Sequence, residues 1–461
     1  MIKLSGLVNR IQRGSQGLSE RIIGFKLPGI KEPFHIAEVY SGSTKTLIRQ
    51  AGSPSELRVK FTDQASVYNL GGSTALIPGF GKSRLIFGQA IFNLLSKPEY
   101  WMKLKPSDFG GEEVQQQLSS LFESQTYKDL CRFGMPHHSI GLVDAQAPNK
   151  ILKTLDSIFK SVNLEMRIKA ANPIEPTFEN GEYVYQTSEE LTQRGMSFVV
   201  PLELLSRGSL DTNSSFINDS EKNSLLATSW GLNISPEAGQ QFALPFVHAS
   251  TKREPGDPYI TRDRALQISG LSEADFDKAR ELIQLKFLLL KKIFGELGFE
   301  LFDMKDEVIY DPRSGEVAIA DITTLDEMRG RDVKYPNVSI SKQLLRAIYK
   351  KALVDKIVKA AERAAEERGN GTTSKDILNE RGFTIPQVRP ETLSIIGEMY
   401  ETMAQKLYSY SEGRIPDEKG LGGLIERINT QILSKEAKDL FTPDSYVALQ
   451  SYLKQYPLET N

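Results

Sequence analysis

One short segment carries three charged residues whose spacing suits catalysis, Asp303-Met304-Lys305-Asp306-Glu307. Side chains on a β-strand alternate between its two faces, so Asp303, Lys305 and Glu307 would share one face. Carboxylates around a lysine can serve phosphate chemistry. They can bind Mg²⁺, which takes one or two carboxylates together with phosphate oxygens and water. A solvated sheet face with cross-strand ion pairs explains the same spacing equally well.

A predicted hairpin brings a fourth charged group to this face. The turn DPRSG joins the runs ELFDMKDEVIY and EVAIADITT. If these five residues form the whole loop, Tyr310 pairs with Glu316 and Lys305 lies opposite Asp321. In that register Glu307 is diagonal to Asp321, within reach of a shared ion.

Two further segments could hold phosphate groups. The small-residue turn 42–45 (GSTK) lets backbone N–H groups approach a phosphate and supplies the ammonium of Lys45. Residues 206–209 (SRGS) offer an arginine and serines for a phosphate monoester. A plain hairpin turn and an ordinary loop are the simpler interpretations of these two segments taken alone.

The bulk properties describe a cytoplasmic protein of two or three domains. The chain has 461 residues, a net charge of −2 and a single cysteine, Cys131. The near-neutral charge favours neither nucleic acid nor a lipid surface as a partner, and one cysteine suits a reducing compartment. The sequence predicts no membrane span and no signal peptide.

The elements that must position these residues are visible in the hydrophobic pattern. Residues 35–63 alternate as short strands with Gly/Ser turns, which predicts an antiparallel meander. Helical spacing predicts helices over 82–97 and 112–124. Ser272 is placed to cap a long helix that runs to Leu297 before Gly298, and the chain after residue 341 is mostly helical.

Taken in chain order, these segments resemble the SAICAR synthetase (phosphoribosylaminoimidazole-succinocarboxamide synthase) family. The turn 42–45 stands where that family has G-K-x-K, and residues 78–82 (PGFGK) stand where it has P-G-K-G. The likeness is strongest over 247–329. There the family's charged positions are held by Lys252, Asp303, Lys305, Glu307, Asp321, Asp326 and Arg329.

The resemblance implies an ATP-dependent ligase of purine biosynthesis with ATP and Mg²⁺ as cofactors. ATP would phosphorylate the carboxylate of carboxyaminoimidazole ribonucleotide (CAIR), and the amine of L-aspartate would then attack the acyl phosphate to give SAICAR. The implied partners are these small molecules, and a homo-oligomer is compatible with them. By position, the resemblance assigns catalysis to Asp303, Lys305 and Glu307; ATP binding to Gly42, Ser43, Thr44, Lys45 and Lys252; the metal to Glu307 and Asp321; and substrate binding to Lys82, Ser83, Arg207, Ser209, Asp326 and Arg329.

The fold implied by the resemblance is α+β with two lobes. A small antiparallel β lobe and a larger mixed α/β lobe hold the ATP site between them, and extra helices follow at the C-terminal end. The corresponding divisions are an N-terminal extension at 1–35, a small β-rich ATP-binding lobe at 36–135, a larger lobe with the metal and substrate site at 136–340, and a helical region at 341–461.

Three departures from the family pattern keep other functions open. Ile322 follows Asp321 where the family has a second acid, residues 67–69 (VYN) replace A-G-D, and the arginine loop at 206–209 is short. The nucleotide-handling positions are therefore better kept than the acceptor-handling ones. The alternatives are a paralogue that joins an amino acid to another heterocyclic or nucleotide carboxylate, and a non-catalytic nucleotide-binding scaffold.

Overall fold

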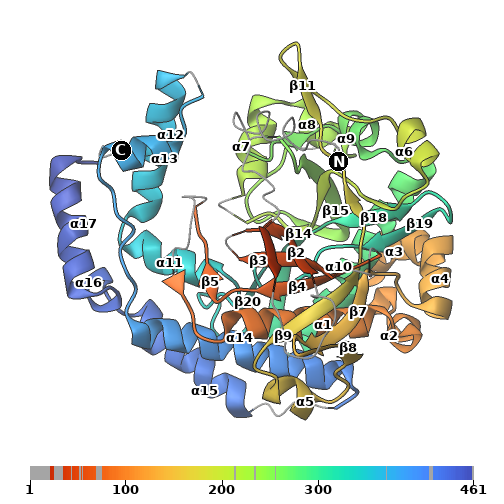
Figure 1. The fold of residues 1–461 in the computed structure, drawn as a ribbon, viewed down its shortest axis with the longest axis horizontal. Coiled ribbons are helices and arrows are strands. Elements are labelled where there is room, and N and C mark those ends of the chain that lie inside the picture. Colours follow the sequence, from red (N-terminus) through yellow and green to blue (C-terminus); the bar gives the residue numbers. More distant parts are fainter. Residues whose placement is uncertain are drawn as a thin grey trace.

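The computed structural model is an α+β protein, as the resemblance implies (Figure 1). It describes residues 21–24, 35–42, 44–50, 53, 55–68, 75–211, 214–232, 235–254, 256–369, 371–414 and 419–458. Over these residues no helix combines the length and the apolar character needed to cross a membrane. The predicted ATP-binding residue Ser43 lies outside the described residues.

A seven-stranded sheet forms the smaller lobe, and its first strands are the predicted meander. All neighbouring strands are antiparallel, in the order β1-β2-β3-β4-β9-β7-β8. Helix α1, which begins at Phe80 and not at the predicted residue 82, packs against β4, β7 and β9. The bounds are β1 Arg21–Gly24, β2 His35–Ser41, β3 Lys45–Gln50, β4 Glu56–Phe61, β7 Ser139–Asp144, β8 Ala147–Ile151, β9 Leu164–Lys169 and α1 Phe80–Leu95.

A five-stranded antiparallel sheet lies at the centre of the larger lobe, in the order β16-β15-β14-β17-β20. Helix α10 (Glu273–Glu296) packs on β14, β15 and β17. Its ends are those that the sequence predicts, since the Ser272 hydroxyl accepts from the amide of Asp275 at 3.2 Å and Gly298 has φ 87°. The strands are β14 Leu202–Ser209, β15 Gln241–Thr251, β16 Tyr259–Ile260, β17 Phe299–Asp306 and β20 Met328–Asp332.

The predicted single hairpin is wrong in two respects. Strand β17 belongs to the five-stranded sheet, whereas β18 (Val308–Asp311) and β19 (Glu316–Ile319) belong to a separate sheet, β10-β13-β18-β19. The register is also shifted by one, because Asp311 pairs with Glu316. Gly315, at φ 68°, donates its amide to the Asp311 carbonyl at 2.8 Å and closes the loop after four residues.

Helices make up the remainder of the larger lobe and most of the C-terminal third. Helix α14 packs along α1, and α12 packs against α13. In Figure 1 α12 and α13 stand apart from the helices α7 and α8 across the top of the molecule. The helices are α2 Pro98–Lys103, α3 Glu112–Glu123, α4 Gln125–Phe133, α5 Leu155–Lys160, α6 Ser188–Arg194, α7 Ser215–Lys222, α8 Leu225–Ser229, α9 Arg262–Ser269, α11 Gln343–Lys351, α12 Val354–Arg368, α13 Ser374–Glu380, α14 Pro390–Ser411, α15 Lys419–Ile428, α16 Ala437–Leu440 and α17 Pro443–Gln455.

Short strands complete the fold. They are β10 Asn172–Pro173 and β13 Phe198–Val199 of the four-stranded sheet, the β5 Gln64–Ala65 and β6 Ala75–Leu76 pair, and the β11 Thr177–Glu179 and β12 Glu182–Val184 hairpin. The sequence divides the chain at residue 135, yet β7, β8 and β9 pair into the same sheet as β4. The four-part domain division remains a prediction.

Candidate active site

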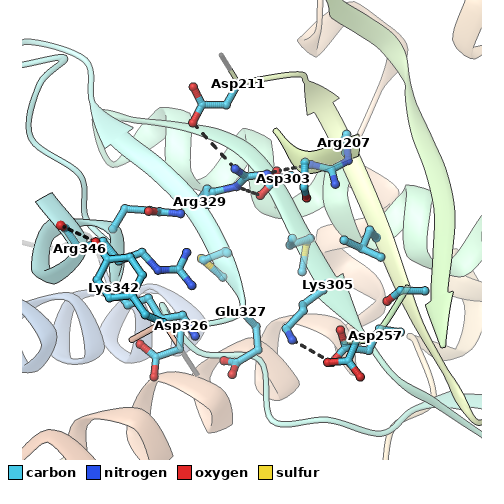
Figure 2. Close-up of a pocket in the computed structure, with 18 of the residues that line it drawn as sticks. Arg207, Asp211, Asp257, Asp303, Lys305, Asp326, Glu327, Arg329, Lys342 and Arg346 are labelled. Atoms are coloured by element: carbon cyan, nitrogen blue, oxygen red, sulfur yellow. Dashed lines mark hydrogen bonds and ion pairs between the residues drawn. The ribbon is translucent and has the colours of Figure 1, made fainter. Parts of the chain in front are cut away.

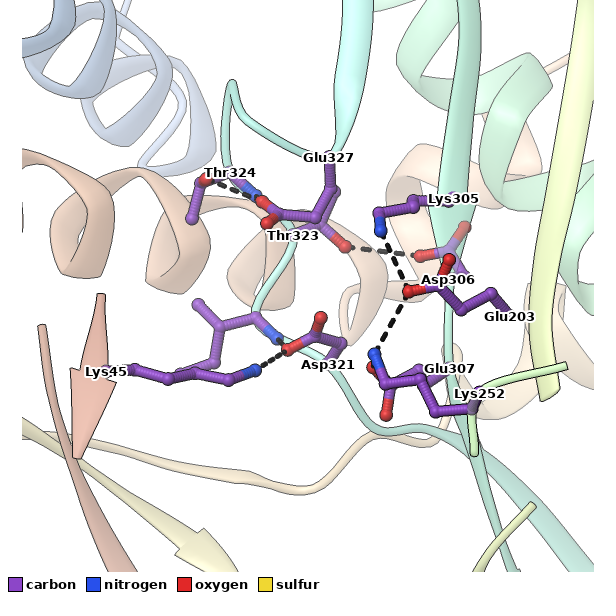
Figure 3. A network of polar contacts seen from close by, with 11 residues as sticks. Lys45, Glu203, Lys252, Lys305, Asp306, Glu307, Asp321, Thr323, Thr324 and Glu327 are labelled. Carbon is purple, nitrogen blue, oxygen red and sulfur yellow. Dashed lines mark hydrogen bonds and ion pairs between the residues drawn. The ribbon is translucent and has the colours of Figure 1, made fainter. Parts of the chain in front are cut away.

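A chain of alternating lysines and carboxylates lies where the two lobes meet (Figure 3). Lys45, at the start of β3, pairs with Asp321 just after β19, with 2.9 Å between Nζ and Oδ1. Lys252, just after β15, lies 2.5 Å from Oε1 of Glu307 and 3.0 Å from Oε1 of Glu203. Lys45 and Lys252 also act electrostatically on each other's carboxylates, so the network brings four segments of the larger lobe to one strand of the smaller lobe.

Lys305 of β17 completes this network through Glu203 at 2.8 Å. The strand alternation predicted for 303–307 is confirmed, because Lys305 and Glu307 reach the network while Asp306 points into the core toward Lys286. Asp321 reaches the same place from β19, although not through the predicted pairing with Lys305. The amide of Lys305 instead donates to the carbonyl of Glu327 at 2.9 Å.

The charges of this network stabilise one another. Burial by itself lowers the pKa values of Lys45 and Lys252, but the surrounding carboxylates outweigh burial and hold both pKa values above the usual range. Burial raises the pKa of Asp321, and the ammonium groups of Lys45 and Lys252 bring it below its usual range. Asp321 thus stays ionised and able to face a cation.

A second charged cluster runs straight across three neighbouring strands. Arg207 of β14 lies opposite Asp303 of β17, which lies opposite Arg329 of β20. The Asp303 carboxylate accepts from Arg207 Nη1 at 2.9 Å and from Arg329 Nε at 2.8 Å. Arg207 also donates to His248 Nε2 at 2.8 Å and to the Tyr259 hydroxyl at 3.3 Å. Two guanidinium groups are therefore fixed side by side by one carboxylate.

On the side of β17 opposite to Lys305, a fully buried ion pair connects β17 to the segment that follows β19. The side chains of Lys286 (α10) and Asp306 are both 0% exposed. Lys286 also donates to Thr323 Oγ1 at 2.6 Å, and Thr323 donates to Asp306 at 3.2 Å. Asp306 lies between Lys305 and Glu307 in sequence, and Thr323 comes two residues after Asp321, so this clamp holds both carboxylate-bearing segments.

The two clusters border a cavity of about 660 Å³. Figure 2 shows Arg207, Asp303 and Lys305 on one side of it and Lys342 and Arg346 of the α11 region on the other. A volume of this size is typical of small-molecule sites, which span roughly 300–1,000 Å³. Tyr68, from the segment 67–69 that differs from the family, also lines this cavity.

Asp326 and Glu327 form the floor between these sides. Asp326 is held by the guanidinium of Arg84 and by the Tyr400 hydroxyl, which donates at 2.8 Å. Glu327 accepts from the amide and hydroxyl of Thr324 at 2.9 and 2.6 Å. Burial raises the pKa of Glu327, and the nearby Asp326 adds to this shift.

The structure brings most of the predicted site residues together. Those that border the cavity or the lysine–carboxylate network are Lys45, Arg207, Lys252, Asp303, Lys305, Glu307, Asp321, Asp326 and Arg329. Ser209 is buried at the end of β14. Gly42 and Thr44 lie in the turn before Lys45, where the Gly42 amide already donates to the Lys45 carbonyl at 2.9 Å.

Two predicted substrate-binding residues lie elsewhere. The Lys82 ammonium donates to the carbonyls of Phe159 and Ser161 at 2.6 and 2.9 Å, at the end of α5. The Ser83 hydroxyl donates to the Gly79 carbonyl at 3.0 Å within the first turn of α1. The polar groups of Lys82 and Ser83 thus satisfy backbone carbonyls, and the placement does not support their assignment to substrate.

Sequence reasoning missed three contributors. Glu203 accepts from two lysines of the network, and His248 and Tyr259 hold Arg207. It also missed the cations that α11 presents to the cavity. Their four-residue spacing, at Lys342, Arg346 and Lys350, was a visible signal for one helical face.

Comparison with known proteins gives one family. The family model for SAICAR synthetase matches residues 148–363. A protein of Archaeoglobus fulgidus, provisionally named a phosphoribosylaminoimidazole-succinocarboxamide synthase, is 31% identical over 225 residues, which are 49% of this chain and 63% of the relative. The phosphoribosylaminoimidazole-succinocarboxamide synthase of Thermoplasma acidophilum is 25% identical over 227 residues, 48% of this chain and 72% of the relative.

Two solved structures are also similar. The SAICAR synthase of Saccharomyces cerevisiae complexed with SAICAR has a TM-score of 0.43 at 16% identity, covering 86% of this chain and 100% of that one. A type-2 SAICAR synthetase in complex with ADP has a TM-score of 0.41 at 16% identity, covering 82% and 99%. Identities and scores this low carry no weight for function.

The geometry and the matched segment point to the same part of the chain. The fold is α+β, and the arginine pair, with Glu203 and Lys305, lines one cavity between the five-stranded sheet and the α11–α12 region. The matched segment includes the residues 247–329 on which the resemblance is strongest. Over residues 148–363 the chain is similar to the SAICAR synthetase family.

Proposed function

We propose that the chain is an ATP-dependent carboxylate–amine ligase that makes SAICAR from CAIR, L-aspartate and ATP. The observation that carries this proposal is that two ion-paired groups lie close enough to act on each other electrostatically. They are Lys45–Asp321 and Glu307–Lys252–Glu203, and Glu203 lines the cavity. Phosphoryl transfer needs positioned cations around the transferring group more than it needs covalent chemistry from the protein. The names of the family relatives supply the substrates.

Lys45 and Lys252 are the groups we assign to the phosphates of ATP. Both ammonium groups keep raised pKa values despite burial, so they remain charged at neutral pH. ATP phosphates would replace the carboxylates as their partners. The carboxylates so released, Asp321 and Glu307, would then be free to face a divalent cation.

The donor set suits Mg²⁺ bound together with ATP. Two carboxylates converge here, and in the part of the chain that the structure describes no cluster of three or more acidic, histidine or cysteine side chains could hold a metal by itself. Mg²⁺ is commonly bound through one or two carboxylates, with the remaining ligands supplied by phosphates and waters. We assign the metal to Asp321 and Glu307, and it would neutralise charge on the transferring phosphoryl group.

The base of ATP has an apolar surface available next to the network. A small buried cluster of Ile309, Ala318 and Ala320, with Val199 and Ala171 packed against it, is separate from the main core. Ala320 directly precedes Asp321, so this cluster leads away from the proposed metal position. A cavity of about 220 Å³ borders Ile309 and Ala318. We assign the adenine to this surface.

The arginine pair is the group we assign to the nucleotide acceptor. Arg207 and Arg329 present fork-shaped donors that match a phosphate. Asp303 holds both arginines, so we reassign it from catalysis to the positioning of these two side chains. Lys305 lies between this pair and the network, where its ammonium can stabilise negative charge on the carboxylate that is activated.

The test is ADP release with MgATP, CAIR and aspartate, each omitted in turn. The proposal predicts ADP formation that needs all three and a succinocarboxamide product by mass. Glu307→Gln is expected to lower kcat by at least about a hundredfold, the range seen when one electrostatic contact to a transition state is lost. The matched control is Glu300→Gln on β17, the strand that ends just before Glu307; Glu300 forms a half-exposed pair with Arg331.

The outcomes separate the other functions. Turnover of ATP only with a different carboxylate or amine would identify a paralogue, and the absence of any nucleotide binding would leave a scaffold. Unchanged turnover in Glu307→Gln would remove Glu307 from the metal site.

A further inference from the structure

Residues 252–258 connect β15 to β16 and carry a charged side chain near each end. Lys252, the first of them, pairs with Glu203 and Glu307 in the lysine–carboxylate network (Figure 3). Asp257, near the other end, lines the cavity (Figure 2). We name residues 252–258 the lysine loop. Its position decides where the Lys252 ammonium lies.

Hydrogen bonds inside the lysine loop make Glu254 the residue through which it can be held. The amide of Lys252 donates to the carbonyl of Pro201 at 3.2 Å, and the amide of Asp257 donates to the carbonyl of Glu254 at 3.2 Å. Asp257 has φ 47°, a left-handed conformation that persists in a residue with a Cβ only where the surrounding structure holds it. A contact that fixes Glu254 therefore also supports Asp257.

The two residues that directly follow Lys252 are both held by one hairpin. Arg253 Nη1 lies 3.1 Å from Glu175 Oε1, and the Tyr185 hydroxyl donates to Glu254 Oε1 at 3.1 Å. Glu175 comes just before β11, and Tyr185 comes just after β12. The β11–β12 hairpin thus reaches the lysine loop through an ion pair and a hydrogen bond.

Tyr185 is itself fixed by helix α9. The guanidinium of Arg264 lies 5.9 Å from the centre of the Tyr185 ring, and its Nη2 donates to the Tyr183 carbonyl at 3.1 Å. Burial, followed by the Glu254 carboxylate, raises the pKa of Tyr185, so its hydroxyl stays protonated and can donate. Tyr185 therefore connects the lysine loop to a helix of the larger lobe.

The segment that leads into this hairpin starts at the surface proposed for adenine. Ala171 packs against the small cluster of Ile309, Ala318 and Ala320. Strand β10 follows it directly and belongs to the same sheet as β18 and β19. Residues 171–185 thus contact the proposed base surface at one end and the lysine loop at the other.

We infer that Tyr185 and Glu175 are positioning residues that place the Lys252 ammonium for the phosphates of ATP. The inference rests on the proposed function, which assigns Lys252 to these phosphates. Neither side chain touches the nucleotide, because Tyr185 acts through Glu254 and Glu175 acts through Arg253. Their loss therefore weakens the binding of a nucleotide that carries phosphates and spares a nucleoside that carries none.

The experiment measures the binding of MgADP and of adenosine by calorimetry. Tyr185→Phe removes one hydroxyl and keeps the ring, and it is expected to weaken MgADP binding about three- to tenfold, as the loss of one hydrogen bond would give. Adenosine binding is expected to change less than twofold. Lys252→Met is expected to weaken MgADP binding more than about tenfold, since it removes a charged contact. In the Lys252→Met protein, Tyr185→Phe is expected to change MgADP binding less than twofold, because the lysine that it positions is gone.

Two more variants separate positioning from a general loss of structure. Glu175→Gln is expected to show the same pattern with a smaller effect, about twofold, because Glu175 and Arg253 are 54% and 28% exposed. The matched control is Tyr183→Phe on β12 of the same hairpin. Among the residues that the structure describes, the Tyr183 hydroxyl forms no hydrogen bond, so this variant is expected to bind both ligands like the wild type.

The binding cycle is independent of turnover, so the two proposals can fail separately. A wild-type protein that makes no SAICAR contradicts the proposed function, while coupling between Tyr185 and Lys252 in MgADP binding still supports the inference. Unchanged MgADP binding in Tyr185→Phe or in Lys252→Met overturns the inference. So does a Tyr185→Phe protein that loses adenosine and MgADP affinity by the same factor, or one whose loss is undiminished in the Lys252→Met background.

Discussion

Removal of Lys286 tests how the segments that carry Glu307 and Asp321 are held in place. Its ammonium is fully buried, pairs with Asp306 and donates to Thr323. Lys286→Met leaves the Asp306 carboxylate buried without a counter-charge, and one of its oxygens already has no partner among the described residues. Breaking a buried pair from one side costs about 3–5 kcal/mol. We expect the free energy of unfolding to fall by that amount.

The double variant Lys286→Met/Asp306→Leu removes both charges and most of that penalty. Replacing a buried pair with apolar side chains is often neutral for stability. We expect stability within about 1.5 kcal/mol of the wild type, but a weaker apparent Mg²⁺ affinity in ATP turnover. The reason is that the clamp ties the Glu307 segment to the Asp321 segment, and a repacked core no longer fixes their separation.

The assay is urea unfolding followed by circular dichroism, together with Mg²⁺ titration of ADP release. Lys292→Met is the matched control, since Lys292 lies on the same helix and pairs with Asp108 near the surface, at 25% and 23% exposure. That variant is expected to lose no more than about 1 kcal/mol. A Lys286→Met protein as stable as this control would refute the reasoning, as would a double variant no more stable than Lys286→Met.

Three further predictions follow from single sites. His248 is fully buried, and burial, followed by the adjacent Arg207 guanidinium, holds its pKa well below the usual value. Below about pH 6.5 only the unfolded chain takes up this proton, so the free energy of unfolding decreases by up to about 1.4 kcal/mol for each unit by which the pH is lowered. His248→Gln is expected to flatten this slope in urea melts at different pH values. Gly88→Ala places a Cβ 2.2 Å from Ile322 Cγ2, next to Asp321, and is expected to lower both the stability and the Mg²⁺ affinity. Gly295 lies in a helix with open space around it, so Gly295→Ala is expected to stabilise the protein by about 0.5–1 kcal/mol in the same melts. Lys82→Met lowers stability by about 1–3 kcal/mol and leaves the KM for CAIR unchanged in steady-state kinetics, because its ammonium serves two carbonyls at the end of α5.

Local signals predicted the elements that position the site. The long helix α10 begins and ends where Ser272 and Gly298 place it, and α3 covers the predicted helix at 112–124. Strand alternation predicted that Lys305 and Glu307 point to one side, where the lysine–carboxylate network lies, and that Asp306 points to the opposite side. These features depend only on residues that are close together in the chain, so they can be predicted from a single sequence.

Features that depend on distant segments were not predictable in the same way. Lys286 is one charged residue in an amphipathic helix, and its burial comes from contact with β17 and Thr323. β17 and β18 belong to different sheets because β17 pairs with β14 and β20, whereas β18 pairs with β13. The rules that predict a hairpin do not include these distant strands. In the segment 100–135, helical spacing predicted only the helix at 112–124. The structure adds α2 and α4 on either side of it, and contacts such as the Tyr127 hydroxyl on the Leu104 carbonyl at 2.7 Å hold them.

The central claim is that this site transfers the terminal phosphoryl group of ATP to a carboxylate before the amine attacks. The most direct measurement uses CAIR with ¹⁸O in its carboxylate and follows the label by mass spectrometry of the released phosphate. An acyl phosphate intermediate leaves one carboxylate oxygen on phosphate, so the account predicts one ¹⁸O per phosphate formed. Phosphate free of label, released together with the amide product, would contradict it.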